Sequence, residues 1–308
     1  MIAMTFEQLT IFIAVAEREH LTRGAEAIGL TPSAASSAIR NLESFYGVEL
    51  FHRVGRRIEL TASGRLFVGE AKAILARAKS AELLLSEISG LARGELNVYA
   101  SQTIAGYWLP PILLKFKRLY PGVELKLTIG NTRMVADAIR DGLAEVGFIE
   151  GLIDEPALSV MPIVADRLVV VASPVHPFAD GREIGREDIV SGSAWVLREK
   201  GSGTRSAFEE ALSGMGIGPC DISVVLELPS NEAVVSAVRS GDCATAVSGM
   251  VAAPFLRQGL LVRAGIELPA RSFAILRHKE RHRGRAAEEL ERISRATADA
   301  HKVGLMGL

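Results

Sequence analysis

The hydrophobic pattern of this chain changes its period near Gly94, and that change constrains the fold more than any other feature. Before Gly94, apolar residues recur every three or four positions, which is the spacing of amphipathic helices. After it, short apolar runs alternate with helical stretches, as they do in α/β domains. A chain of 308 residues has room for two or three domains. We therefore predict a helical N-terminal part followed by an α/β region.

The first thirty residues predict two helices. Thr5 and Gln8 have the form of a capping box at the start of a helix over 5–18. Thr22 is the expected N-cap of a short second helix, and Gly29 stands where a left-handed residue usually ends one.

A third helix follows, with Thr31 in the N-cap position and Pro32 in the first turn. At about 100° per residue, one face of this helix is small and polar and the opposite face is apolar. The polar face carries Ser33, Ser36, Ser37 and Arg40, and the apolar face carries Ala35, Ile39 and Leu42. No acid lies between positions 27 and 42. Three short helices, with a glycine in the turn between the second and the third, predict a helix-turn-helix. Its last helix is expected to enter the major groove of DNA.

Residues 51–57 form a basic cluster around Gly55, as expected of a wing that grips phosphates beside the groove. A solvated surface explains an arginine cluster equally well when it stands alone. The chain has 35 basic and 36 acidic side chains, and residues 1–65 hold seven arginines and seven glutamates. Because the net charge gives little non-specific affinity, we expect salt-sensitive binding through two half-sites, with cations alone on the recognition face and the wing.

From position 61 to 89 apolar residues follow spacings of four and three, which predicts one long helix with a heptad seam. The seam consists of Phe67, Ala71, Ile74, Ala78, Ala81, Leu85 and Ile88. The simplest partner for it is the same helix of a second chain. The alternative is packing against its own domain.

The α/β region contains several short apolar runs that read as strands. They cover 96–100, 123–129, 146–149, 168–172, 194–197, 222–228, 244–247 and 273–276. Small polar residues follow several of these runs, where ligands bind in open α/β sheets. These residues are Ser101, Gln102, Thr103, Asn131, Thr132, Asn231 and Ser248.

A glycine-rich loop, 198–205, leaves a predicted strand and opens a helix. Its N–H groups and hydroxyls are suited to an anion, and Arg205 adds a planar fork of donors. We therefore expect the loop to contribute Gly201, Ser202, Gly203, Thr204 and Arg205 to a ligand site. It lacks the Lys-Ser or Lys-Thr pair of a Walker loop. A capped helix start with a surface arginine is the alternative interpretation.

The N-terminal motifs resemble the winged helix-turn-helix of LysR-type transcriptional regulators, and the resemblance continues through nearly the whole chain. The matching residues are Phe6, Leu9, Leu21, Thr22, Arg23, Ala25, Glu26, Thr31, Ser33, Ala34, Ser36, Ile39, Arg40, Leu42, Glu43, Gly47, Leu50, Phe51, Arg53, Leu60, Thr61 and Gly64. The chain departs from the family at Ser37 and Ala38, where long polar side chains usually stand, and at Gly24, where alanine is usual. We expect Gly24 to loosen the second helix by about 1 kcal/mol.

The resemblance implies a winged helix-turn-helix over 4–61, a dimerisation helix over 62–92 and an effector-binding domain over 93–302. That domain is similar to periplasmic solute-binding proteins, with subdomain I at 93–161 and 269–302 and subdomain II at 162–268. The residues expected to contact DNA are Thr22, Arg23, Thr31, Pro32, Ser33, Ser36, Ser37, Arg40, Arg53, Arg56 and Arg57.

The resemblance also implies the partners. They are an operator in double-stranded DNA, a small anionic effector held between the subdomains, and further copies of the chain in a homodimer or homotetramer. RNA polymerase is a further partner implied by the family, and a neighbouring divergent operon is the implied target.

Other function classes fit less well. A solute-binding protein leaves the helix-turn-helix unexplained, and no nucleophile elbow or dinucleotide fingerprint indicates an enzyme. His278 and His282 stand among basic residues that disfavour a metal ion, and no cofactor is expected. Cys220 and Cys243 are expected to be buried structural thiols rather than a redox switch. The absence of a signal peptide and of long apolar runs predicts a cytoplasmic protein.

Overall fold

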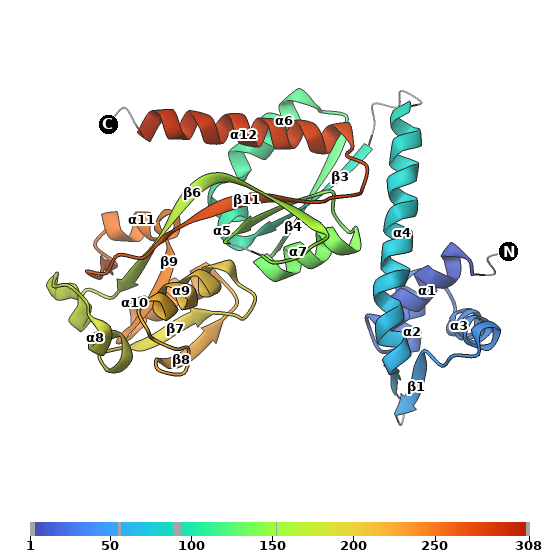
Figure 1. Ribbon diagram of the computed structural model, residues 1–308, viewed down its shortest axis with the longest axis horizontal. Helices are drawn as coiled ribbons and strands as arrows, with labels where there is room; N and C mark the ends of the chain where they lie inside the picture. Colours follow the sequence, from blue (N-terminus) through green and yellow to red (C-terminus); the bar gives the residue numbers. More distant parts are fainter. Residues whose placement is uncertain (1–3, 55–56, 89–93, 152, 306–308) are drawn as a thin grey trace. The chain divides into compact units, whose positions relative to one another are not determined.

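The computed structural model describes residues 4–54, 57–88, 94–151 and 153–305 (Figure 1). The chain divides into two compact units, one built on residues 1–90 and one built on the α/β region that follows. Among the described residues, none of the helices is both long and apolar enough to span a membrane.

The N-terminal unit consists of helices followed by a small hairpin and a long helix. Its elements are α1 (Phe6–Ala16), α2 (Leu21–Ala27), α3 (Pro32–Tyr46), β1 (Phe51–Val54), β2 (Arg57–Leu60) and α4 (Ala62–Ile88). The capping box of α1 is confirmed, because Gln8 N donates to Thr5 Oγ1 at 3.1 Å and Thr5 N donates to Gln8 Oε1 at 3.0 Å. Thr31 caps α3, and its Oγ1 accepts from Ala34 N at 3.2 Å.

The predicted N-cap of the second helix is wrong by two residues. His20 caps α2, since its Nδ1 accepts from Arg23 N at 3.3 Å, and Thr22 already lies inside the helix. An imidazole nitrogen can fill the role that a hydroxyl usually has at a helix start. The predicted stop at Gly29 is confirmed by its positive φ of 70°.

Gly24 lets α2 pack closely on α1, a contact that the expectation from helix propensity did not include. A Cβ at this position would lie 2.7 Å from Val15 Cα and 3.0 Å from Ala14 O. Because these two atoms belong to the backbone of α1, rotation of a side chain cannot make room for a larger residue at position 24. Glycine therefore lowers the helix propensity of α2 but permits the close contact between α2 and α1.

The first half of the seam on α4 packs against its own unit. Ala71 is fully buried, and Phe67 and Ile74 join it in a core with Phe12 and Leu42. Farther along α4, Leu84 is 40% exposed and Leu85 is 66% exposed. The side chain of Ile88 lies outside the described residues. Packing against its own unit is thus confirmed for the first half of the seam, whereas pairing with a second copy stays a prediction for the second half.

The α/β unit contains nine strands and nine helices in the part of it that the structure describes. They are β3 (Gly94–Ser101), α5 (Gln102–Tyr107), α6 (Pro110–Leu119), β4 (Val123–Gly130), α7 (Thr132–Asp141), β5 (Val146–Glu150), β6 (Leu158–Ala172), η1 (Pro177–Asp180), α8 (Arg186–Ser191), β7 (Ala194–Arg198), α9 (Gly203–Gly214), β8 (Ser223–Leu228), α10 (Asn231–Ser240), β9 (Cys243–Ser248), α11 (Gly249–Arg257), β10 (Val262–Arg263), β11 (Ala270–His278) and α12 (Arg285–Leu305). Each predicted strand is present, although 168–172 is the end of the much longer β6.

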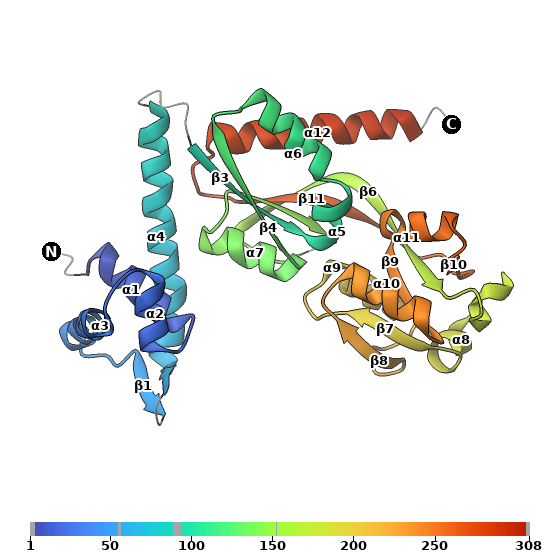
Figure 2. The same ribbon diagram turned by 180° about the vertical axis from the view of Figure 1, so that it is seen from behind.

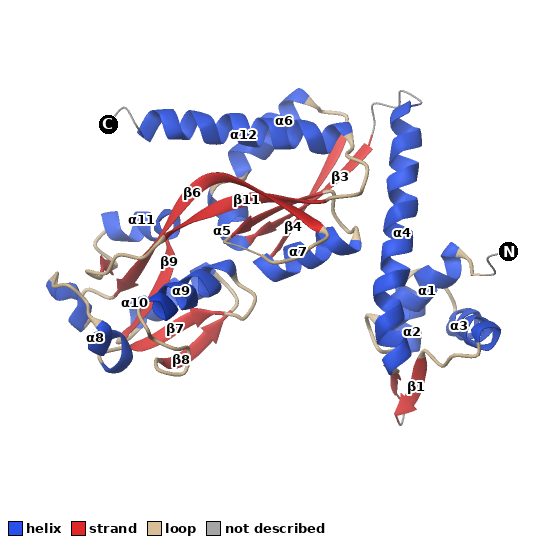
Figure 3. Cartoon of the chain, in the orientation of Figure 1, coloured by secondary structure: helices blue, strands red, loops and turns tan. Residues whose placement is uncertain are grey.

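Two long antiparallel strands, β6 and β11, join the two halves of the sheet (Figure 3). The strand order is β4-β3-β5-β11-β6-β9-β7-β8, with β10 beside β6. Residues 273–276 of β11 pair with β5, and residues 168–172 of β6 pair with β9. The half with β3, β4 and β5 is subdomain I, and the half with β7, β8 and β9 is subdomain II.

Each subdomain has its own apolar core. In subdomain I, α6 and α12 lie side by side on the sheet in both views, and Phe116 and Leu290 are buried between them and the strands (Figure 2). In subdomain II, Trp195 and Phe208 stack at 5.0 Å between ring centroids in the core under α9. The carboxyl ends of the parallel strands in the two halves bring together the residues described next.

Candidate functional site

A buried carboxylate lies at the centre of a polar cluster formed by both subdomains. Glu150 ends β5 and is 1% exposed. Its carboxylate accepts hydrogen bonds from Ser101 Oγ, from Thr103 Oγ1 at 3.2 Å and from Thr204 Oγ1 at 3.4 Å. Ser101 and Thr103 belong to subdomain I, whereas Thr204 begins α9 in subdomain II. The carboxylate therefore bridges the two subdomains.

Glu150 forms no ion pair with any residue in the described ranges. Its carboxylate is compensated by hydroxyl groups alone, which is a costly arrangement for a buried anion. Because all three hydroxyls donate to Glu150, they can only accept further hydrogen bonds, and Thr103 Oγ1 and Thr204 Oγ1 already do so, from Asn231 Nδ2 and Arg271 Nη1.

Asn231 makes a second connection between the subdomains. At the start of α10, its Nδ2 donates to Thr103 Oγ1 at 3.2 Å and its backbone N donates to Gln102 Oε1 at 2.6 Å. Its Oδ1 accepts from Arg198 Nη1 at 2.9 Å. Arg198 is in turn paired with Glu199 at 2.8 Å. Both polar atoms of the Asn231 side chain, and its backbone N, are thus hydrogen-bonded.

A buried ion pair continues the cluster toward β9. Arg271 and Asp166 face each other on β11 and β6, and their side chains are 2.8 Å apart and almost fully buried. Arg271 Nη1 donates to Thr204 Oγ1 at 3.1 Å, and Ser248 Oγ donates to Asp166 Oδ1 at 2.6 Å. Both charges therefore have polar partners in addition to each other.

The glycine-rich loop approaches subdomain I so closely that only glycine fits. A Cβ on Gly203 would lie 2.1 Å from Glu150 O and 2.5 Å from Thr132 Oγ1. The loop is also hydrogen-bonded to α7, because Arg133 N donates to Gly201 O at 3.1 Å. Asn131 Nδ2 donates to Glu199 Oε1 at 3.2 Å.

Two polar groups at the cluster have no hydrogen-bond partner among the described residues. They are the buried Oγ of Ser202, a residue 1% exposed, and the buried Nη2 of Arg271, a residue 7% exposed. Buried donors normally have a hydrogen-bond acceptor. Two donors without an acceptor in one cluster therefore indicate a place for a ligand.

The structure brings nearly all of the predicted effector residues together. The connected residues are Ser101, Gln102, Thr103, Asn131, Thr132, Gly201, Ser202, Gly203, Thr204, Asn231 and, through Asp166, Ser248. Arg205 is not among them. Its guanidinium donates to Glu209 at 2.7 Å, to Arg198 O at 3.1 Å and to Glu227, so it fastens α9 to the neighbouring strand.

The recognition helix α3 exposes the side chains that were predicted to face DNA. Thr31, Pro32, Ser33, Ser37 and Arg40 are exposed, and Ser36 is half-buried. Ala35, Ile39 and Leu42 are buried, as predicted. On α2, Thr22 and Arg23 are exposed as well. Arg56 and the side chains of Arg53 and Arg57 lie outside the described residues.

Arg40 makes no hydrogen bond or ion pair with any part of the chain that is described. The one acid near the end of this face, Glu43, is turned inward, because its Oε1 accepts from Leu50 N at 2.8 Å and from Phe51 N at 3.1 Å. The guanidinium of Arg40 is therefore available to a partner, whereas the carboxylate of Glu43 is hydrogen-bonded within the unit.

Comparison with known proteins identifies the family. A model of the LysR substrate binding domain matches residues 89–299, and a model of the bacterial regulatory helix-turn-helix protein, lysR family, matches residues 6–65. The chain belongs to the LysR family of transcriptional regulators. These are ligand-responsive, DNA-binding proteins, and the fold described above is theirs.

Relatives and solved structures agree with this assignment. The HTH-type transcriptional regulator YeiE of Escherichia coli (strain K12) is 34% identical over 91% of this chain and 93% of its own length. CbnR, solved full-length with its target DNA, has a TM-score of 0.64 at 22% identity over 95% of this chain and 99% of its own. The CcmR regulatory domain of Synechocystis PCC6803, solved with 2-PG, has a TM-score of 0.61 at 24% identity over 67% of this chain and 98% of its own. At these identities the two structures show the shared fold.

Four charged residues at the cluster of this LysR-type regulator were missed by the sequence reasoning. They are Glu150, Asp166, Arg198 and Arg271. A signal was present, because each stands in or at the end of an otherwise apolar strand. Charged residues are rarely buried in such positions without a partner, so their pattern indicated an internal network.

The wing and the cysteines also differ from expectation. Glu59 lies on β2 opposite His52, with 3.7 Å between Glu59 Oε2 and His52 Nε2, so the wing does not carry cations alone. Cys220 is exposed, which corrects the expectation of a buried thiol. Burial raises the pKa of the Cys243 thiol, which therefore stays protonated at neutral pH.

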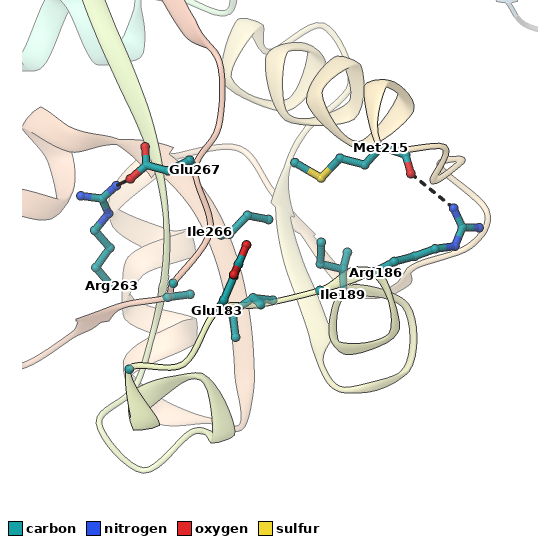
Figure 4. A pocket seen from close by; sticks show the side chains of 12 residues that line it. Glu183, Arg186, Ile189, Met215, Arg263, Ile266 and Glu267 are labelled. Atoms are coloured by element: carbon teal, nitrogen blue, oxygen red, sulfur yellow. Dashed lines mark hydrogen bonds and ion pairs between the residues drawn. The ribbon is translucent and has the colours of Figure 1, made fainter.

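Two of the hollows that the described part of the effector unit contains bear on the site. One, of about 720 Å³, lies in subdomain II and is rimmed by Glu183, Arg186, Arg263 and Glu267 (Figure 4). It contains none of the predicted residues, and Arg263 is already paired with Glu267 at 2.7 Å. The other, of about 670 Å³, is lined by α9 and the crossing strands, and includes Gly151 and Arg271. It therefore flanks the buried cluster.

Proposed function

We propose that this LysR-type regulator binds a roughly palindromic operator in double-stranded DNA and that a small anion, bound at the buried cluster, changes this binding. The observation that carries the proposal is the pair of unpartnered buried donors, Ser202 Oγ and Arg271 Nη2, in a cluster that both subdomains form. An anion that takes these donors gains charge-assisted hydrogen bonds from one hydroxyl and one guanidinium.

Ligand binding at this cluster is suited to changing the shape of the effector unit. Thr103 and Thr204 come from different subdomains and share Glu150 as an acceptor. A ligand that contacts both sides more strongly in one arrangement of the subdomains shifts the domain toward that arrangement. The related CcmR regulatory domain, solved with 2-PG, supports a small-molecule effector for this fold.

The DNA contact is proposed for α3, for Thr22 and Arg23 on α2, and for the arginines of the wing. In a two-fold dimer, recognition helices meet half-sites about 34 to 36 Å apart or a multiple of that. The structure of CbnR with its target DNA supports this use of the fold. We include RNA polymerase as a further partner and the cytoplasm as the site of action.

Exposed apolar residues support self-association. Leu85 on α4 is 66% exposed, and we propose that this half of α4 pairs with the same helix of a second copy. The two edge strands of the large sheet, β4 and β8, also present apolar residues, such as Ile129 at 53% and Val225 at 52% exposure. Exposed apolar edges are usually covered, so we propose that effector units pair through them to form a tetramer.

Self-association is tested by ultracentrifugation of full-length variants. Leu85→Glu is expected to disrupt the α4 pairing and to lower the mass of the assembly. Val225→Glu is expected to leave a dimer that no longer forms a tetramer. A mass that neither variant changes would contradict these interfaces.

Calorimetry with a panel of metabolite anions tests the effector site. Ser202→Ala and Arg205→Ala form a matched pair, because Ser202 Oγ is an unpartnered donor in the cluster, whereas the guanidinium of Arg205 is paired with Glu209, Glu227 and Arg198 O. The proposal is supported if the affinity for the anion falls in Ser202→Ala and stays unchanged in Arg205→Ala. Equal loss in both variants, or no loss in Ser202→Ala, contradicts it.

A footprint on the intergenic DNA upstream of the gene tests the DNA surface. Arg40→Ala is expected to abolish the footprint at protein concentrations that protect with the wild type. Arg292→Ala removes an exposed arginine of α12 and serves as the control. An intact footprint with Arg40→Ala would remove α3 from the proposed interface.

A further inference from the structure

The hydroxyls that an anion would be expected to use at the cluster already serve the chain's own carboxylate. Ser101, Thr103 and Thr204 all donate to Glu150, and each of them is no more than 1% exposed. Among the described residues, the hydroxyls of Ser101 and Thr103 make one further hydrogen bond, from Asn231 Nδ2 to Thr103 Oγ1. Glu150 thus occupies the position that a bound anion has in such a cradle.

An incoming anion therefore meets a negative charge as well as the donors of Ser202 and Arg271. Two acceptor-only groups at hydrogen-bond distance repel each other, and burial strengthens that repulsion. A proton between them turns the same contact into a charge-assisted hydrogen bond.

We propose that Glu150 determines which anions this regulator accepts. It selects anions that carry their own hydrogen-bond donor, either a protonated oxoanion or a hydroxy acid, and it rejects anions that have only acceptors. The donor of the ligand faces Glu150, and its anionic part faces Ser202 Oγ and Arg271 Nη2. The inference rests on the proposed effector function of the same cluster.

A ligand at the Glu150 carboxylate also meets the N-terminus of α9, because Thr204 Oγ1 donates to that carboxylate at 3.4 Å. The start of α9 lies directly against the end of β5, since a Cβ on Gly203 would lie 2.1 Å from the backbone oxygen of Glu150. A ligand that hydrogen-bonds Glu150 replaces the bond from Thr204, which is the hydroxyl contributed by subdomain II. Selection by Glu150 and rearrangement of the two subdomains therefore occur at the same contact.

Phosphate and sulfate provide the first test, because they have the same shape but only phosphate carries a proton at neutral pH. Calorimetry on the full-length protein is expected to show that phosphate binds more tightly than sulfate by about tenfold or more, the size expected when a buried acceptor is left without a donor. Glycolate and acetate form a second pair, which differs by a hydroxyl. A preference in the first pair identifies an oxoanion site, and a preference in the second pair identifies a hydroxy-acid site.

Glu150→Gln is the decisive variant, because glutamine has the same shape and offers a donor as well as an acceptor. We expect the preference within the responsive pair to fall by about tenfold or more, through tighter binding of the anion that lacks a donor. Glu209→Gln removes a carboxylate that pairs with Arg205 outside the cluster and is the matched control. It should leave the preference unchanged.

Several outcomes overturn the inference. They are equal binding within both pairs by the wild type, an unchanged preference in Glu150→Gln, and binding of none of the four anions by either protein. If another anion is bound, and Ser202→Ala weakens it while Glu150→Gln does not alter selectivity, the effector site stands and the role of Glu150 fails.

Discussion

Asn231 Nδ2 on α10 donates a 3.2 Å hydrogen bond to Thr103 Oγ1 on α5, which joins the two subdomains directly. Asn231 is fully buried, and its Oδ1 also accepts from Arg198. A single amide thus satisfies a hydroxyl of one subdomain and a guanidinium of the other. The arrangement of the two subdomains depends on such residues as much as on the crossing strands.

Asn231→Ala should lower the stability of the effector unit. The substitution leaves Arg198 Nη1 without its acceptor in a buried place, which costs about 1 to 3 kcal/mol. Urea unfolding followed by tryptophan fluorescence reports on this unit, because both tryptophans, Trp108 and Trp195, lie in it. Ser240→Ala, which removes an exposed hydroxyl of the same helix, should change the stability by less than about 0.5 kcal/mol.

Arg271→Met should be more damaging than any exposed arginine substitution. It leaves Asp166 buried with only Ser248 as a polar partner, and loss of one member of a buried pair costs about 3 to 5 kcal/mol. The same unfolding measurement should show partial recovery in the double variant Asp166→Asn, Arg271→Met, because the buried charge is then gone. A double variant no more stable than the single one would show that lost packing, and not the uncompensated charge, causes the damage.

Gly24→Ala should destabilise the N-terminal unit although alanine favours helix. The added Cβ meets Val15 Cα at 2.7 Å, and overpacking of this kind costs about 1 to 3 kcal/mol. Gly69→Ala in α4 meets nothing within 4 Å and should gain up to about 1 kcal/mol. Hydrogen exchange of the α1 and α2 amides measures both effects, and equal gains in the two variants would disprove the close contact.

The stability of the effector unit should fall as the solution is acidified below pH 6.5. Burial lowers the pKa of His176 from its ordinary 6.5, and its ring accepts from Phe178 N at 3.1 Å and contacts Ser193 Oγ at 3.1 Å. Below pH 6.5 the unfolded chain takes up a proton on this ring while the folded chain does not, so acid favours unfolding. The loss ends once pH falls below the lowered pKa.

This contribution of His176 has a maximum slope of about 1.4 kcal/mol per pH unit. Unfolding free energies of the wild type and His176→Asn between pH 5 and pH 8 measure it by difference. If the unfolding free energy has the same pH slope below pH 6.5 in both proteins, groups other than His176 cause the loss of stability.

Much of the effector cluster could be predicted because apolar runs mark the ends of strands. Once β3, β4, β8 and β9 were recognised, the polar residues after them had to meet at one side of the sheet. The charged residues were not predicted, since their partners come from distant strands. Arg271 and Asp166 are 105 positions apart, and only the pairing of β6 with β11 puts them face to face.

The remaining differences have similar causes. Gly24 is explained by a contact with α1 that helix propensity does not contain, and His20 by a ring nitrogen in a place where hydroxyls are usual. Arg205 follows the expected glycine-rich loop, but Glu209 lies one helical turn along and Glu227 on the neighbouring strand. The local motif predicted the position of the arginine and not the direction of its side chain.

The most direct test of a ligand-controlled DNA contact is the footprint of Ser202→Ala titrated with an anion that binds the wild type. Because Ser202 Oγ has no partner among the described residues, the substitution should leave stability and the ligand-free footprint unchanged. The anion concentration that alters the footprint should rise by about 10-fold or more, as expected for a lost hydrogen bond to a charged group. An unchanged anion concentration, or a footprint that no bound anion alters in the wild type, would contradict the account.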